Sequence, residues 1–372
     1  MTARPRGSRL LLFNLATDLG HPVLGFTSQW IAALASRVTS IDVITMYAGE
    51  IALPDNVRVY SAGRERGWSQ PRRVAAFYRH LFRILAERPI DGCFSHMIHA
   101  FSVLAAPVLR TRGIPLVTWY AHPQLNNSLK LAHFCSQRMV TSLPSAYPYR
   151  RDKLSIIGQG IDTERFAPTP AVTPDDGLIL CAGRISEVKG HPSLLRAFAK
   201  LPAHLRLDIV GATTGRRDEV YADGLHRLAF ALDIADRVRF LPAVPPSLLP
   251  DIYRRCTVHV NLTPAGFGDK VAWEAMACGR PCLVANDDFR DTLGAHADAL
   301  LFHGENDLVA KLAAVLSSTS EAREAVGRDL RTNVVRLHSL PRLAERILDE
   351  LEQARQTMRP HRAQVDTTPA RP

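Results

Sequence analysis

Short apolar runs alternate with longer amphipathic segments along most of the chain. In the first half, the runs that read as buried strands are RLLLFNLA, IDVITMY, DGCFSHM and IPLVTWYA. Between them, apolar residues recur at helical spacing over Thr27–Arg37, Pro71–Glu87 and Ala100–Arg112. Strands that alternate with helices indicate right-handed β-α-β units and a parallel sheet covered on both faces.

The pattern pauses at QGIDTERFAPTPAVTPDDG and restarts with LILCAGR, LRLDIVGA, RVRFLPAV, TVHVNLTP and RPCLVAN. We therefore predict an α/β protein with two doubly wound, Rossmann-like domains and a hinge near residues 160–175. The predicted parts are a first domain over 1–165, a second over 166–340, a helix over 341–358 that can cross back to the first domain, and a disordered tail over 359–372. Two such sheets facing each other would form a ligand cleft.

Composition adds limits on the class of protein. The chain has 372 residues, 46% of them apolar and 22% charged, as in soluble globular proteins. No apolar run approaches the roughly 18–20 residues that span a bilayer, and the start is too weakly apolar for a signal peptide. Six scattered cysteines without a C-x-x-C pair predict buried free thiols in a reducing cytoplasm.

Charge is divided unevenly between the two halves. Residues 1–165 carry 20 lysines and arginines against 10 acidic residues, whereas residues 166–372 carry 26 of each. An anionic lipid surface, a phosphorylated acceptor and a nucleic acid are the candidate partners for the basic half. No recognised nucleic-acid motif occurs, so we do not expect nucleic acid.

A single carboxylate, Glu274, interrupts the apolar stretch VAWEAMA. Such a helix is normally buried, and a buried carboxylate needs a hydrogen-bonding partner. Either an arginine of the core or a ligand satisfies Glu274.

A second cluster follows the strand LILCAG, which ends at Gly183. Arg184 and Lys189 flank the next loop, just before a helix that begins near Pro192. Free amides at a helix start with two cations beside them suit a diphosphate, although a solvated loop is the plainer interpretation.

With these motifs in order, the chain resembles family 4 glycosyltransferases of the GT-B fold. The resemblance is carried by IGQGIDTERFAP, AGRISEVKG, IVGATTG, GDKVAWEAMACGRP and RLHSLPRLAERILDEL, and it extends from about residue 10 to residue 350. It implies transfer of a hexose from a UDP- or GDP-linked sugar, with retention of configuration and without a metal or cofactor. The chain has no D-x-D triplet, which agrees with that expectation.

The resemblance also implies roles for single residues. Arg184 and Lys189 would hold the donor diphosphate, and Glu274 the ribose, with Gly183, Lys270 and Val271 close to the phosphates. The family commonly has a second glutamate that contacts the sugar, but Gly266 stands at its position here. Asp269 is either its replacement or a turn and N-cap residue.

By the same resemblance the first domain binds the acceptor. His122, after the strand PLVTWYA, matches a cleft histidine that contacts the sugar or helps to remove the acceptor proton. His99, together with His96, is a further candidate after the preceding strand. The loop ATDLGHPVLGF, with Gly20, His21 and Gly25, resembles the acceptor loop of the fold.

The stretch GRERGWSQPRRVAAFYRHLFRILAERP combines seven arginines with aromatic residues. It is either a core-facing helix with a solvated basic side or a patch that lies on anionic lipid. We expect a cytoplasmic enzyme, with the inner membrane face as an alternative site, that glycosylates a lipid-linked, glycan or small-molecule acceptor. An epimerase of the same fold and a non-catalytic binding subunit are the alternatives.

Overall fold

Seven parallel strands form the first sheet of the computed structural model, which describes residues 8–21 and 24–358. Their order is β3-β2-β1-β4-β5-β6-β7. The strands are β1 (Arg9–Thr17), β2 (Ser40–Ala48), β3 (Val57–Ser61), β4 (Gly92–His96), β5 (Leu116–Trp119), β6 (Arg138–Thr141) and β7 (Leu154–Ile156). The predicted tail over 359–372 lies outside the described residues and stays a prediction.

Five parallel strands form the second sheet, in the order β10-β9-β8-β11-β12. They are β8 (Leu178–Ala182), β9 (Arg206–Val210), β10 (Val238–Leu241), β11 (Val258–Asn261) and β12 (Cys282–Val284). In both sheets the strand order reverses direction once, between β1 and β4 in the first and between β8 and β11 in the second. Such switch points open a crevice at the carboxyl ends of the strands.

Helices cover both faces of the sheets, as strands buried on both faces require. Those of the first unit are α1 (Thr27–Ala35), α2 (Gln70–Glu87), α3 (His99–Thr111) and α4 (Asn127–Cys135). Those that follow are α5 (His191–Ala199), α6 (Arg216–Ala231), α7 (Leu249–Arg255), α8 (Lys270–Ala277), α9 (Arg290–Leu293), α10 (Ala297–Leu300), α11 (Gly304–Ser317), α12 (Ser320–His338) and α13 (Leu340–Met358).

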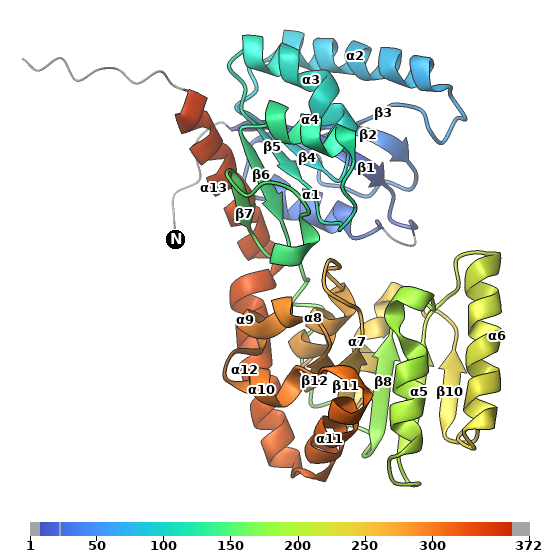
Figure 1. The fold of residues 1–372 in the computed structure, drawn as a ribbon. Helices are drawn as coiled ribbons and strands as arrows, with labels where there is room; N and C mark the ends of the chain where they lie inside the picture. The colour runs from blue at the N-terminus through green and yellow to red at the C-terminus, as the bar shows by residue number, and fades with distance from the viewer. Residues whose placement is uncertain (1–7, 22–23, 359–372) are drawn as a thin grey trace, which may run out of the picture.

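The last helix, α13, belongs to the core of the first unit. Leu343, Ile347 and Leu351 are buried with residues of α1 and of β1, β4 and β5. Figure 1 shows α13 running along the flank of the first unit, whereas α12 lies against the second. Because only Ser339 separates α12 from α13, this helix pair joins the two units a second time.

The linker between β7 and β8 contains neither helix nor strand and is held by arginines. Arg331 of α12 donates to the carbonyl oxygens of Thr163 and Phe166, and Arg254 of α7 donates to that of Ala167. Backbone carbonyls of an irregular segment need such donors when they leave water. The domain limits at residues 165 and 340 stay a prediction.

In the second unit, the helices α6, α11 and α12 were not predicted individually. In the first unit, the predicted elements agree with the structure, but β3, β6, β7 and α4 were not predicted. These elements are short, from three to nine residues. The edge strand β7 has no buried residue, so it lacks the apolar run that marked the other strands. All six cysteines are free thiols, and all but the half-buried Cys135 are buried, as predicted.

Candidate functional site

The switch points of the two sheets collect most of the predicted site residues. In the second sheet, Gly183, Arg184 and Lys189 follow β8, and Asp269, Lys270, Val271 and Glu274 follow β11. In the first sheet, Gly20, His21 and Gly25 follow β1, His99 follows β4, and His122 follows the next strand, β5. The doubly wound topology therefore brings to the same end of each sheet residues that are about 100 positions apart in the first half and about 90 in the second.

Two glycines shape the loop after β8. Gly183 has φ +128°, a backbone conformation that other residues rarely adopt. A Cβ atom on Gly211, in the motif IVGATTG, would lie 1.9 Å from the carbonyl oxygen of Gly183. The loops that follow β8 and β9 therefore touch through their backbones, and this contact leaves the exposed Arg184 at the rim of the crevice.

Asp269 holds Lys189 in a largely buried ion pair. Both side chains are 12% exposed, and the carboxylate also accepts hydrogen bonds from Asn261 (2.6 Å) and Thr263 (2.7 Å). Burial alone would raise the pKa of Asp269, but Lys189 and these donors outweigh it and keep the pKa below its ordinary value. The charge of Lys189 is therefore already balanced within the protein.

The N-cap role that the sequence offered for Asp269 is wrong. Asp269 stands at the N-cap position of α8, but its side chain makes no capping hydrogen bond. Its oxygens accept from the side chains of Lys189, Asn261 and Thr263 instead. The sequence signal for this cluster was the pair of polar residues Asn261, which ends the strand VHVN, and Thr263. The cluster was not predicted.

Glu274 is buried and has a tyrosine as its partner. The hydroxyl of Tyr253, on α7, donates to Glu274 Oε2 at 3.0 Å. The expected alternative, a hydrogen-bonding arginine, is wrong: Arg165 affects the carboxylate only electrostatically. Burial raises the pKa of Glu274, and the nearby Lys270 opposes that shift. Within residues 8–21 and 24–358, Oε1 has no hydrogen-bond donor, so half of the carboxylate is unused.

Lys270 is a second cation of the site that, like Arg184, forms no ion pair with any described residue. Its Nζ lies 4.2 Å from the ring centroid of Phe26, which precedes α1 in the first unit. Across the part of the chain that the structure describes, it makes no ion pair or hydrogen bond. Burial lowers the pKa of Lys270, although Glu274 and Asp162 act against that shift. A desolvated ammonium ion stacked only on an aromatic ring can accept an anionic partner.

The segment 266–270 connects the two units. The backbone N–H of Gly266 donates to Ser145 Oγ at 2.6 Å, and Ser145 in turn donates to Asp288. The ring of Phe267 meets that of His122 edge-on, with 5.6 Å between centroids. The segment that precedes α8 is therefore in direct contact with the loop that carries His122.

Gly266 replaces the expected glutamate for a steric reason. It has φ +96°, and a Cβ atom there would lie 2.8 Å from the side chain of Pro123 in the first unit. A glutamate would strain the backbone and push the two units apart.

His122 is held in one tautomer by its own loop. Its Nδ1 accepts a hydrogen bond from the backbone N–H of Gln124 at 3.1 Å. The ring proton is therefore on Nε2, which makes that nitrogen a hydrogen-bond donor.

The other histidines of the first unit differ in accessibility. His96 is buried between Trp30 and Trp119, where burial lowers its pKa to about 3, so it is a core residue and not a site residue. His99 packs edge-on against Tyr120, and burial lowers its pKa as well. His21 accepts from Leu24 N–H at 3.0 Å and shapes the loop after β1.

The comparisons with known proteins concern mainly the second unit. Residues 162–332 match the family model "Glycosyl transferases group 1". A D-inositol 3-phosphate glycosyltransferase of Rhodococcus opacus is 36% identical over 149 residues, which cover 36% of this chain and 33% of that protein. The same enzyme of Thermomonospora curvata is 32% identical over 200 residues, covering 48% and 44%. The chain thus matches less than half the length of these curated relatives.

Solved structures match over nearly the whole chain. HepE from Anabaena in complex with UDP superposes with a TM-score of 0.72 at 16% identity, covering 93% of this chain and all of that one. Sucrose-phosphate synthase from Thermosynechococcus elongatus gives 0.73 at 16% identity and covers 94% of this chain. The fold is GT-B. The predicted GT-B architecture is therefore confirmed, with residues 162–332 matching the family model across β8 to α12.

Two further features of the described residues concern membranes and metals. Among the described residues, no helix is both long and apolar enough to cross a bilayer. In the same part of the chain, no three histidine, cysteine, aspartate or glutamate side chains are grouped as metal ligands.

Proposed function

We propose that this chain is a retaining glycosyltransferase that moves a hexose from a nucleotide-sugar to a hydroxyl acceptor, with protein cations in place of a metal ion. The proposal rests on one observation at the start of α8. There Lys270 has no ion pair with a described residue, Oε1 of Glu274 has no donor among them, and no side chain caps the first backbone amides of the helix. This helix lies within the segment that matches glycosyl transferases group 1.

The donor base is proposed to be uracil first and guanine second. Support for UDP comes from HepE, which was solved with UDP and with UDP-glucose. A further structural neighbour, described as trehalose-6-phosphate from Escherichia coli, was solved with UDP-2-fluoro glucose. These are ligands of proteins with about 15% identity to this chain. In our proposal, Glu274 Oε1 accepts hydrogen bonds from the ribose hydroxyls.

Lys270, with Arg184, is proposed to bind the diphosphate directly, and this revises the role expected of Lys189. Lys189 is already neutralised by Asp269, whereas Lys270 has no counterion among the described residues. An ammonium ion without a partner gains more from an incoming diphosphate than one that must first leave a carboxylate. Lys189 then acts by fixing the loop after β8.

The proposed reaction breaks the bond between the sugar C1 and the phosphate oxygen and forms one between C1 and the acceptor oxygen on the same face. The acceptor proton passes to the leaving phosphate. Negative charge grows on the diphosphate in the transition state, where Lys270, Arg184 and the amides of α8 stabilise it. His122, whose ring meets that of Phe267 in the segment 266–270, donates from Nε2–H to a hydroxyl of the transferred sugar.

For the acceptor, a small phosphorylated polyol is the first candidate. The curated relatives are named D-inositol 3-phosphate glycosyltransferases, although the chain matches only about a third to under half of their length. Lipid-linked and glycan acceptors are the other classes. The loop with Gly20, His21 and Gly25 would border this acceptor.

The basic helix α2 is proposed to bind anionic lipid. Its residues Phe77, Leu81 and Ile84 are buried in the core, so the core-facing interpretation holds for one side. On the other side Phe82 is 50% exposed and stacks on Tyr78, with Arg79 and Arg83 exposed beside it. We expect the pair Arg79→Gln and Arg83→Gln to weaken binding to phosphatidylglycerol vesicles about 30-fold, at roughly 1 kcal/mol per cation. Equal co-sedimentation of variant and wild type would contradict this.

The activity is tested by incubating the protein with UDP- and GDP-hexoses and a panel of phosphorylated polyols, then measuring nucleotide release. We expect release only with an acceptor, and NMR of the product should show the anomeric configuration of the donor. Conversion of the donor sugar without any acceptor would instead identify the epimerase. Donor binding without turnover, across lipid-linked and glycan acceptors as well, would identify a binding subunit.

A further inference from the structure

A polar cavity lies at the amino-terminal ends of strands in the first sheet, opposite the ends at which the candidate active site lies. Its volume is about 160 Å³, far more than the roughly 10–15 Å³ that one water molecule needs. Arg9 begins β1, Ser40 begins β2, and Arg88 directly follows α2. Since β1 ends at Thr17 beside the candidate active site, about 26 Å of extended strand separates the two places.

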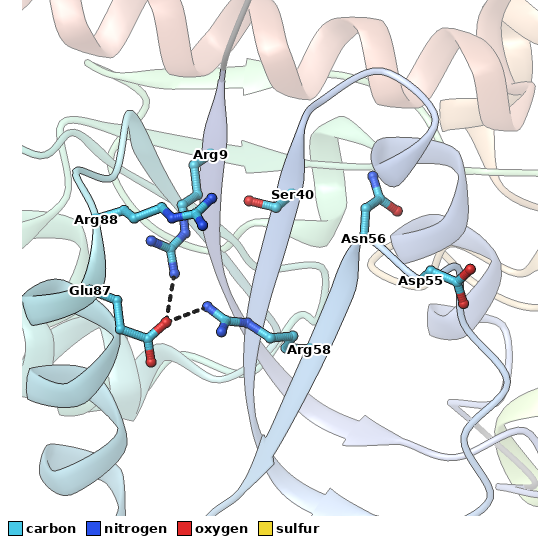
Figure 2. A pocket seen from close by; sticks show the side chains of 7 residues that line it. All are labelled: Arg9, Ser40, Asp55, Asn56, Arg58, Glu87 and Arg88. Atoms are coloured by element: carbon cyan, nitrogen blue, oxygen red, sulfur yellow. Dashed lines mark hydrogen bonds and ion pairs between the residues drawn. The ribbon is translucent and has the colours of Figure 1, made fainter.

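Two acidic groups beside this cavity, Asp42 and Glu87, are already paired with arginines, whereas Asp55, which lines it, forms no ion pair with any described residue. Asp42 accepts from Arg9 Nε at 2.9 Å and from Arg58 Nε at 2.9 Å through its two oxygens. Glu87 accepts from Arg58 Nη2 at 2.8 Å and forms a looser ion pair with Arg9, at 3.7 Å. Figure 2 shows the contacts of Glu87 with Arg9 and Arg58, and Asp55 on the other side of the view, away from the arginines.

Hydrogen-bond donors remain after these pairs are formed. Arg9 is only 5% exposed, and its Nη1 is buried without a hydrogen-bond partner. Arg88 and the hydroxyl of Ser40 make no hydrogen bond or ion pair with any residue the structure describes. The cavity therefore has unused donors on Arg88 and Ser40, beside the unsatisfied and buried guanidinium of Arg9, and two of its three neighbouring carboxylates are occupied.

We propose that this cavity binds a phosphate group. Guanidinium groups match the geometry of phosphate oxygens, and a phosphate supplies the acceptors that Arg9, Arg88 and Ser40 lack. The wall is fixed, because the Asn56 amide donates to the carbonyl oxygens of Ala35 (2.9 Å) and Val38 (3.3 Å). The site is independent of the nucleotide-sugar proposal. Its ligand carries a phosphate either as a free anion or as a lipid headgroup.

The test is calorimetric titration of the whole chain with inorganic phosphate, at ionic strength held constant with sodium chloride. The variants are Arg88→Gln, which removes an exposed donor, and Arg110→Gln, which removes the same charge outside the cavity as a control. We expect saturable binding to the wild type and to Arg110→Gln, and at least five-fold weaker binding to Arg88→Gln. Ser40→Ala, which removes the hydroxyl donor, should also bind more weakly.

A second arm separates the two sources of phosphate. Vesicles of phosphatidylcholine with and without phosphatidic acid are sedimented with the protein, with and without inorganic phosphate as competitor. Binding to phosphatidic acid that Arg88→Gln loses, and Arg110→Gln retains, assigns the site to a lipid headgroup. Binding of inorganic phosphate alone assigns it to a free anion. If neither binds, or if Arg88→Gln binds as well as Arg110→Gln, the proposal is overturned, whatever the response to nucleotides.

Discussion

At the scale of single residues, the candidate site depends on how three buried charges are compensated. Asp269 neutralises Lys189, and Tyr253 satisfies half of Glu274. Lys270 lies over the ring of Phe26 and forms no ion pair with any described residue, although Glu274 and Asp162 act on it electrostatically. Burying an uncompensated charge is costly, so the groups left incomplete are those where a charged or hydroxyl-bearing ligand gains most. Two substitutions separate these roles.

The first is Lys270→Met, compared with Lys189→Met. If Lys270 stabilises the leaving diphosphate, its loss should lower kcat about 100- to 1000-fold, the usual effect of removing one donor to transition-state charge. Steady-state kinetics with saturating acceptor measure this, and Lys130→Met, on the exposed face of α4, is the control. A kcat within three-fold of wild type for Lys270→Met, with a large loss for Lys189→Met, would return the diphosphate role to Lys189.

The second is Glu274→Gln, which should stabilise the fold while removing nucleotide binding. Burial raises the pKa of Glu274, so its neutral form favours folding below the unfolded-state value of 4.5, and that gain is lost as pH rises through the folded pKa. Near pH 8 the variant should therefore be more stable than wild type, by about 1 kcal/mol. The difference should vanish near pH 4. Urea unfolding at both values measures it, and a variant less stable at pH 8 would contradict the account.

At the scale of elements, the segment 266–270 connects the second unit to the first. Its glycine is required twice, by φ +96° and by the close approach of Pro123. The sequence indicated only that a glutamate was missing there. It gave no sign of Pro123, because the two residues are 143 positions apart and meet only when both sheets are built.

Gly266→Ala should therefore destabilise the protein more than Gly304→Ala. Gly304 also has positive φ, at +80°, but a Cβ atom there meets nothing within 4 Å, so it isolates the backbone cost. We expect that cost to be about 1 kcal/mol at both positions, with a further 1–3 kcal/mol at Gly266 from the contact with Pro123. Calorimetric unfolding midpoints measure both. Equal destabilisation would mean that the contact does not hold the units together.

The predictability of the elements followed their burial. Strands buried on both faces, such as β1 and β8, are continuous apolar runs and were predicted. The edge strand β7 and the nine-residue α4 were not, because a short or exposed element leaves little periodicity. In the site, Arg184, Lys189 and Glu274 were singled out in the sequence, and their roles stay a prediction that the resemblance implies. Tyr253 was not singled out, since α7 reaches Glu274 only through tertiary packing.

At the scale of the whole molecule, two doubly wound units are joined by the linker and by the pair α12 and α13. The candidate residues lie at the switch points of the two sheets. The ring contact between Phe267 and His122 joins the second unit to the first. Because α13 is buried in the first unit while α12 packs on the second, relative motion of the units must bend the chain near Ser339 and the linker. The two units are thus coupled mechanically.

The central claim is that a nucleotide binds at the start of α8 and that Glu274 accepts hydrogen bonds from its ribose hydroxyls. Its most direct test is the thermal stabilisation of wild type and Glu274→Gln by UDP, GDP, ADP and TDP. A nucleotide at 100 times its Kd should add about 2.7 kcal/mol of stability to the wild type. We predict that UDP gives this response and that Glu274→Gln, although folded, loses it. No stabilisation of the wild type by any of the four, or equal stabilisation of the variant, would contradict the account.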